Sequence, residues 1–263
     1  MAMANHHDNF DLWNSKYHRW NSVNLGPKKD ILEGWSKAAR NNGLYFGVSV
    51  HAAHAWMFYE PAQGCDSQGP MAGVPYDGKL TAADGKGTWW EGYDPQALYA
   101  QNHPVAEVYS WEWGDKVSVP DVNYCQDFFD RHVDMINRYD PDLLYFDDTE
   151  LPLWPISVQG LRIAAHFYNK SIRDHGENQA VLTGKKLSEE HKDALVCDIE
   201  RGVTNATESH PWQTCTCLGF WHYDRWVYEQ DGYKTAPTVI RMLVDIVSKN
   251  GNLLLSVPIR PDG

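Results

Sequence analysis

The chain has 263 residues, 43% of them hydrophobic, which is enough for one large α/β domain with a sizeable core. Its formal net charge of −12 argues against nucleic acid or an anionic membrane as partner, because phosphate groups are bound by basic surfaces. There is no apolar run long enough for a transmembrane helix. Its twelve Trp and fourteen Tyr are typical of surfaces that bind carbohydrate or protein.

The N-terminal sequence and the cysteine content are informative about the cellular compartment of the protein. The N-terminus shows neither the basic nor the apolar region of a signal peptide. Five cysteines are an odd number without a regular framework, which is typical of a reduced protein. No internal repeat or linker is visible. We therefore expect a single cytoplasmic domain spanning residues 1–263.

The predicted elements alternate between strands and helices. An irregular segment at 5–27 comes first. Hydrophobic periodicity and turn residues then predict helices at 30–41, 122–138, 158–175 and 238–249, and strands at 44–50, 143–146, 180–183, 195–199, 220–223 and 253–257. This alternation indicates a parallel barrel or a doubly wound sheet. No Gly-x-Gly-x-x-Gly motif follows a strand, so a dinucleotide-binding fold is disfavoured.

A long insertion at about 57–120 separates two of the predicted strands. It is rich in Gly, Pro and aromatic residues, among them Trp89 and Trp90, and it contains one short predicted helix at 95–101. Connections of this length are usually functional or disordered. The tryptophan content argues against disorder, so we expect the insertion to shape a binding surface.

Two carboxylates follow the predicted strand at 143–146 directly, at Asp147 and Asp148. Parallel α/β barrels carry their chemistry at the carboxyl ends of strands. A buried carboxylate is also costly unless it is paired or functional. The alternative is that one carboxylate caps the next helix while the other is solvated.

Nearly every predicted strand ends in polar residues, which a barrel would bring to one mouth. These residues are His6, His7, Asp8, His51, His54, Asp147, Asp148, Glu150, Lys185, Lys186, Asp198, Glu200, His222 and Tyr223. Two chemistries fit: a metallohydrolase with histidine and aspartate ligands, and a glycoside hydrolase with two carboxylates. The His-His-Asp spacing differs from the familiar zinc motifs, and the many aromatic residues favour the glycosidase. Cys215 and Cys217 are interpreted as two semi-buried thiols.

Seven motifs carry a family resemblance over essentially the whole chain. In order they are His6-His7-Asp8-Asn9-Phe10, Leu12-Trp13-x-Ser15-Lys16-Tyr17, Gly26-Pro27-Lys28-Lys29-Asp30, the strand at 44–50, Asp142-Leu143-Leu144-Tyr145-Phe146-Asp147, Pro211-Trp212-Gln213-Thr214-Cys215 and Asn250-Gly251-Asn252-Leu253-Leu254-Leu255. Together they resemble motifs of glycoside hydrolase family 29, the α-L-fucosidases.

The resemblance implies a TIM-type (β/α) barrel and a retaining exo-glycosidase that releases terminal α-L-fucose from fucosylated oligosaccharides or glycosides, with no cofactor and no metal. It implies that Asp147 is the nucleophile. Gln213 stands where some members carry the acid/base, so this role is assigned to Glu200, at a place that other members use. The structural alternative for Glu200 is a salt bridge with Arg201 or Lys185. The substrate-binding residues are predicted to be His6, His7, Trp13, His51, Tyr145, Lys185, Trp212 and His222.

The sequence also departs from the family pattern. Thr183-Gly184-Lys185 stands where members use an arginine to bind fucose. The family's first strand and its C-terminal β-sandwich have no counterpart here, which implies an N-terminally truncated or incomplete barrel. Open strand edges expose unpaired backbone groups, so we expect a homo-oligomer to cover them. The alternative function is a non-catalytic carbohydrate-binding or interaction module derived from such a barrel.

Overall fold

The computed structural model describes residues 1–62, 68–69, 72, 80–100, 103–147, 151–185 and 187–262. They form two compact units, Met1–Leu182 and Thr183–Gly263. Among the described residues, none of the helices combines the length and the apolar character needed to cross a membrane.

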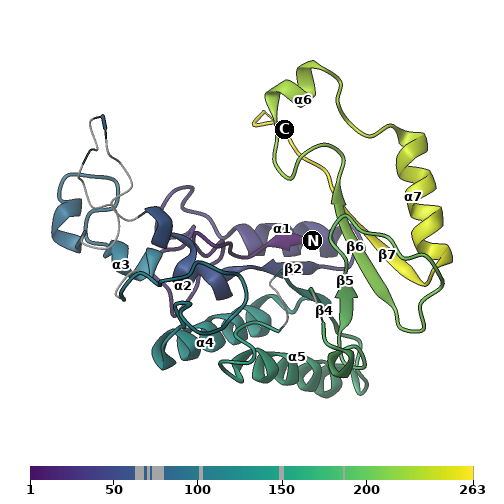
Figure 1. The fold of residues 1–263 in the computed structure, drawn as a ribbon, viewed down its shortest axis with the longest axis horizontal. Helices are drawn as coiled ribbons and strands as arrows, with labels where there is room; N and C mark the ends of the chain where they lie inside the picture. The colour runs from purple at the N-terminus through teal and green to yellow at the C-terminus, as the bar shows by residue number, and fades with distance from the viewer. Residues whose placement is uncertain are drawn as a thin grey trace. The chain divides into compact units, whose positions relative to one another are not determined.

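The first unit alternates strands and helices (Figure 1). Its elements are β1 (Ala2–Met3), α1 (Ile31–Asn41), β2 (Gly47–Val50), η1 (Ala52–His54), α2 (Ala55–Phe58), η2 (Glu60–Ala62), η3 (Ala82–Gly85), α3 (Pro95–Tyr99), α4 (Val122–Tyr139), β3 (Leu143–Phe146) and α5 (Gln159–His175). β2 pairs in parallel with β1 and with β3, so the strand order follows the chain.

Local signals explain where the long helices begin and end. The carboxylates of Asp30 and Asp121 accept backbone N–H groups at the starts of α1 and α4. α5 ends at Gly176, whose φ of 82° is the left-handed conformation that suits glycine. α4 and α5 pack together, and β2 and β3 contain fully buried residues such as Val48 and Leu144. Burial of these apolar faces fixes the register of the strands.

The second unit is again a parallel sheet in chain order. Its elements are β4 (Val181–Lys185), which starts in the first unit, η4 (Glu189–His191), β5 (Val196–Asp198), β6 (Trp212–Cys217), α6 (Arg225–Glu229), α7 (Ala236–Ser248) and β7 (Gly251–Ser256). β4 pairs with β5, β5 with β6, and β6 with β7, all in parallel. The α/β class predicted from the sequence is therefore confirmed.

One predicted strand is wrong. Residues 220–223 are irregular chain, and Phe220 and Trp221 are exposed. The strand of this region is β6, whose six residues are all buried. Its Trp-Gln-Thr-Cys-Thr-Cys sequence has no aliphatic run, and only Thr214–Cys217 alternate. This short alternation is typical of a half-buried strand and does not indicate one buried throughout. Its Thr and Trp residues nevertheless favour extended backbone.

The predicted insertion at 57–120 consists, where it is described, of short helical turns, α3 and irregular chain. It packs through aromatic clusters. Trp20, Leu25 and Leu98 form one buried cluster with Trp90 and Tyr93 against it. Trp56 and Met57 belong to a second cluster.

Candidate active site

Asp147 lies directly after β3, where its backbone N–H continues the ladder by donating to Val50 O at 3.1 Å. Both carboxylate oxygens are held. The Tyr145 hydroxyl donates to Oδ1 at 3.0 Å, and His51 Nε2 lies 3.1 Å from Oδ2. The Asp147 side chain is 19% exposed, so the carboxylate is positioned by two side chains and still reaches solvent.

His51 follows β2 and is itself fixed from three sides. Its Nε2 lies 2.7 Å from Ser49 Oγ as well as near Asp147. Its backbone N–H donates to Asn5 Oδ1 at 3.2 Å. His51 is buried, and these contacts set the orientation of its ring.

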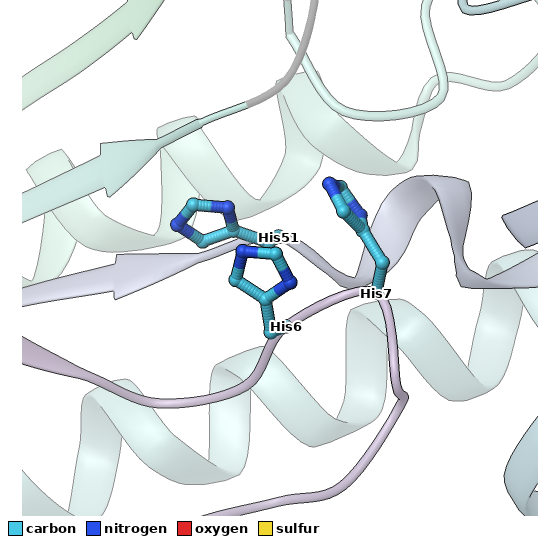
Figure 2. A group of neighbouring side chains, drawn as sticks. All are labelled: His6, His7 and His51. Carbon is cyan, nitrogen blue, oxygen red and sulfur yellow. The ribbon is translucent and has the colours of Figure 1, made fainter. Parts of the chain in front are cut away.

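His6 and His7 come from the loop after β1 and lie beside His51 (Figure 2). The His6 and His51 rings are stacked, with centroids 4.3 Å apart. The His6 and His7 rings meet edge to face at 4.5 Å. The structure therefore brings His6, His7, His51 and Asp147 together, as their positions at strand ends predicted. Tyr145, within β3, contacts Asp147.

Phe58, Trp111 and Tyr109 form an aromatic wall beside His7. The rings of Phe58 and Trp111 both have centroids 5.0 Å from that of His7, and Tyr109 contacts Trp111. Trp111 belongs to the predicted insertion and is partly exposed. Trp89, which the sequence drew attention to, instead contacts Trp20 and is largely exposed.

A buried ionic network beneath this site was not predicted. Arg131 of α4 forms two hydrogen bonds to the Asp11 carboxylate, through Nε and Nη2, and one to Asn9 Oδ1 at 2.7 Å. Asn5 Nδ2 donates to Asp11 Oδ1 at 3.2 Å and lies 3.3 Å from His132 Nε2. Asn5 thereby joins the network to His51, and residues 5 to 11 carry the His6–His7 pair.

Burial has electrostatic consequences in this network. It raises the pKa of the Asp11 carboxyl, against the charge of Arg131, which favours the ionised form. Burial also lowers the pKa of His18 well below its ordinary value, and the charge of Arg131 adds to that effect. His18 Nε2 lies 2.7 Å from Asn9 O. This contact links residue 18 to the segment that follows His6 and His7.

In the second unit, Glu200 lies in a tight turn after β5. The backbone N–H of Gly202 donates to Ile199 O at 3.0 Å, and Arg201 adopts a φ of 52°. Thr214 Oγ1 lies 2.9 Å from Ile199 O and 3.0 Å from Gly202 O, which fastens the turn to β6. Glu200 is paired with Lys185 Nζ at 2.9 Å, and its side chain is 42% exposed.

Gln213 occupies a buried position on β6. Its Nε2 donates to Asp198 Oδ1 at 2.8 Å, and the Cys215 thiol donates to Oδ2 at 3.0 Å. An amide cannot give and recover a proton in the way a carboxylic acid does. Gln213 therefore acts here as a partner that satisfies the buried Asp198 carboxylate.

The other predicted site residues are placed differently. Trp13 is fully buried, and Trp212 is buried with its indole N–H donating to Lys249 O at 2.9 Å, so neither ring presents a surface to a sugar. His222 is exposed in the bends after β6. His54 is buried and stacked on Trp113. Asp148, Glu150 and Lys186 lie outside the described residues.

Carboxylates and imidazoles at the carboxyl ends of parallel strands define an α/β protein with an enzyme-like site. The family model for Alpha-L-fucosidase matches residues 1–263. The chain therefore belongs to the α-L-fucosidase family.

Similar proteins agree with this assignment. The Alpha-L-fucosidase of Dictyostelium discoideum is 23% identical over 259 residues, which are 97% of this chain and 44% of the relative. That of Branchiostoma floridae is 25% identical, over 99% of this chain and 47% of the relative. A solved Thermotoga maritima alpha-fucosidase in complex with a mechanism-based inhibitor shares the fold, with a TM-score of 0.60, 22% identity and coverage of 99% of this chain and 47% of that chain. This chain spans about half the length of the curated relatives it matches.

Proposed function

We propose that this chain carries the catalytic residues of an exo-glycosidase that releases terminal α-L-fucose with retention of configuration. The observation that carries the proposal is Asp147, held at the end of β3 by Tyr145 and His51 in a chain of the α-L-fucosidase family. A structural relative from Thermotoga maritima is described in complex with fucose, which supports fucose as the sugar.

In the first step, Asp147 attacks the anomeric carbon and forms a glycosyl ester while the bond to the leaving oxygen breaks. The hydrogen bond from Tyr145 and the contact with His51 hold the two oxygens of this carboxylate in a fixed orientation before attack. The developing oxocarbenium character is balanced by the carboxylate charge. In the second step, water attacks the same carbon, and Asp147 leaves as a carboxylate.

Glu200 is proposed to protonate the leaving oxygen in the first step and to take a proton from water in the second. The turn held by Thr214 limits the movement of its backbone. Lys185 Nζ donates to Glu200 Oε2 at 2.9 Å, which orients the carboxylate. His6, His7 and His51 are proposed to bind sugar hydroxyls, and the wall at Phe58 suits an apolar C6 methyl.

Two finer features belong to the same proposal. The parallel strands are proposed to be part of a (β/α) barrel, because the fold matches solved fucosidases.

Self-association is proposed because α7 presents Ile240, Val244 and Val247 to solvent, each more than half exposed. Light scattering after gel filtration tests this, and a monomer at all concentrations would contradict it.

Trapping the covalent intermediate tests the mechanism. A 2-deoxy-2-fluoro-fucosyl donor with a good leaving group slows the second step, and peptide mass spectrometry then locates the label. We expect the label on Asp147 and none in the Asp147→Asn variant. NMR of the first product formed should show the α anomer. A label elsewhere, or the β anomer first, would contradict retention through Asp147.

The alternative is a carbohydrate-binding module without turnover. The observation that favours it is Gln213, an amide bonded to Asp198 at a place where family members can carry a carboxylate. A rise in melting temperature with fucose, together with no hydrolysis of any fucoside, would support the module.

A further inference from the structure

Three imidazoles converge in the first unit. His6, His7 and His51 each offer one ring nitrogen, and these three atoms all lie within 4.8 Å of one another. Two of the rings come from adjacent residues of one loop and the third from the end of β2, as Figure 2 shows. The cluster therefore joins two segments that are far apart in the sequence.

The contacts of His51 are those of a metal-ligating histidine. Its Nε2 lies 3.1 Å from Asp147 Oδ2 and 2.7 Å from Ser49 Oγ. A neutral ring whose Nε2–H donates to one of these oxygens has its lone pair on Nδ1. Histidine ligands commonly donate their second N–H to a carboxylate, which fixes the tautomer and makes the ligand more basic. Asn5 fixes the backbone of the same residue.

The donor set selects the kind of cation. Three imidazoles suit borderline transition metals such as Zn²⁺, Ni²⁺ and Cu²⁺, whereas Mg²⁺ and Ca²⁺ prefer oxygen ligands. A zinc ion with bonds of about 2.05 Å needs neighbouring nitrogens about 3.3 Å apart. The nitrogens lie up to 4.8 Å apart, so side-chain rotations of His6 and His7 must bring them closer by up to about 1.5 Å.

We propose that His6, His7 and His51 bind one borderline transition-metal cation, of which Zn²⁺ is the probe, and that this cation blocks the sugar site. The blocking rests on the proposed function, in which the same imidazoles bind sugar hydroxyls. The cation is thus an inhibitor, not a cofactor, and Asp147 is placed to balance part of its charge. The binding itself stands on the geometry alone.

Isothermal titration with ZnCl₂, on protein without a histidine tag and at neutral pH, tests the binding. We expect one site per chain, with affinity reduced by more than about tenfold in His6→Gln, His7→Gln and His51→Gln. His210→Gln, an exposed histidine outside the cluster, is the matched control and should bind as the unmodified chain does. MgCl₂ should give no heat from this site.

Zinc binding that survives all three cluster variants would overturn the proposal and point to other ligands, such as Cys215 and Cys217. Absence of binding would overturn it as well. Because a variant can fail to fold, protection is also measured on the unmodified chain. Zn²⁺ should shield His6, His7 and His51 from diethyl pyrocarbonate, as read by mass spectrometry, and unchanged labelling would contradict the site.

Measurements of hydrolysis distinguish a failure of the zinc site from a failure of the proposed glycosidase activity. Zn²⁺ should inhibit hydrolysis of an aryl fucoside, EDTA should restore it, and added fucose should weaken zinc binding in the titration. A chain that binds zinc at these histidines but hydrolyses no fucoside would retain the metal site and overturn the glycosidase. Loss of activity on adding EDTA to untreated enzyme would overturn inhibition and favour a metallohydrolase.

Discussion

Replacing Arg131 by methionine should destabilise the protein far more than any exchange of a surface arginine. The Arg131 and Asp11 side chains are at most 1% exposed, and the pair is bidentate. Removing one partner of a buried pair leaves an uncompensated charge, at a cost of about 3–5 kcal/mol. Arg138→Met, on the same helix, removes only a partly exposed pair with Asp134 and should cost less than about 1 kcal/mol.

Urea denaturation followed by circular dichroism measures both variants. An Arg131→Met variant within about 1 kcal/mol of Arg138→Met would refute the reasoning. The double variant Arg131→Met, Asp11→Leu should recover part of the loss, because it removes both buried charges and leaves an apolar pair. Since Asp11 and Asn5 hold the segment with His6 and His7, the single variant should also lose zinc binding at those histidines.

Three further predictions address the site and the pH dependence. Glu200→Ala should slow the first step by about 100-fold or more for poor leaving groups and far less for an activated aryl fucoside. The second step, which needs a base for water, should slow for both, and azide should restore turnover of the aryl fucoside by replacing water. Equal losses in the first step for both substrates would contradict the acid/base assignment. Trp111→Ala should raise KM for a fucosylated oligosaccharide about three- to tenfold and leave KM for a small aryl fucoside unchanged. The control Trp89→Ala, which lies away from His7, should change neither KM. Equal rises in KM for both substrates would contradict a role of Trp111 in binding the part of the substrate beyond the fucose. His18 has a pKa lowered well below 6.5 by burial, so its contribution to stability is present above about pH 6.5 and is lost as the pH falls further, by up to about 1.4 kcal/mol per unit. Urea titrations at several pH values should show a shallower loss in His18→Asn, and identical slopes would contradict this.

Much of the first unit could be predicted from sequence because its signals are local. The Leu143–Phe146 run with its preceding turn located β3, and Asp30 with Gly43 bounded α1. The place of Asp147 in the candidate site could then be predicted, because the end of a strand fixes the position of the next side chain. β6 was missed because all six of its residues are buried although several are polar. The partner of one of them, Gln213, is Asp198 of the neighbouring strand β5, which the sequence of β6 does not reveal.

The ionic network could not be predicted because its partners are more than a hundred residues apart. One signal was present in α4. Arg131 and His132 share a face with Phe128 and Met135, the apolar face of the helix. A charged residue on such a face requires a buried partner. The sequence does not say that the partner is Asp11.

Release of p-nitrophenol from its α-L-fucoside by the purified chain tests the central claim most directly, beside an Asp147→Ala control of unchanged melting temperature. The proposed mechanism predicts turnover by the unmodified chain and a loss of at least about 1,000-fold in the variant. Equal activity of the two proteins would contradict the role of Asp147. No activity in either protein, with fucose still raising the melting temperature, would contradict catalysis and leave a sugar-binding protein.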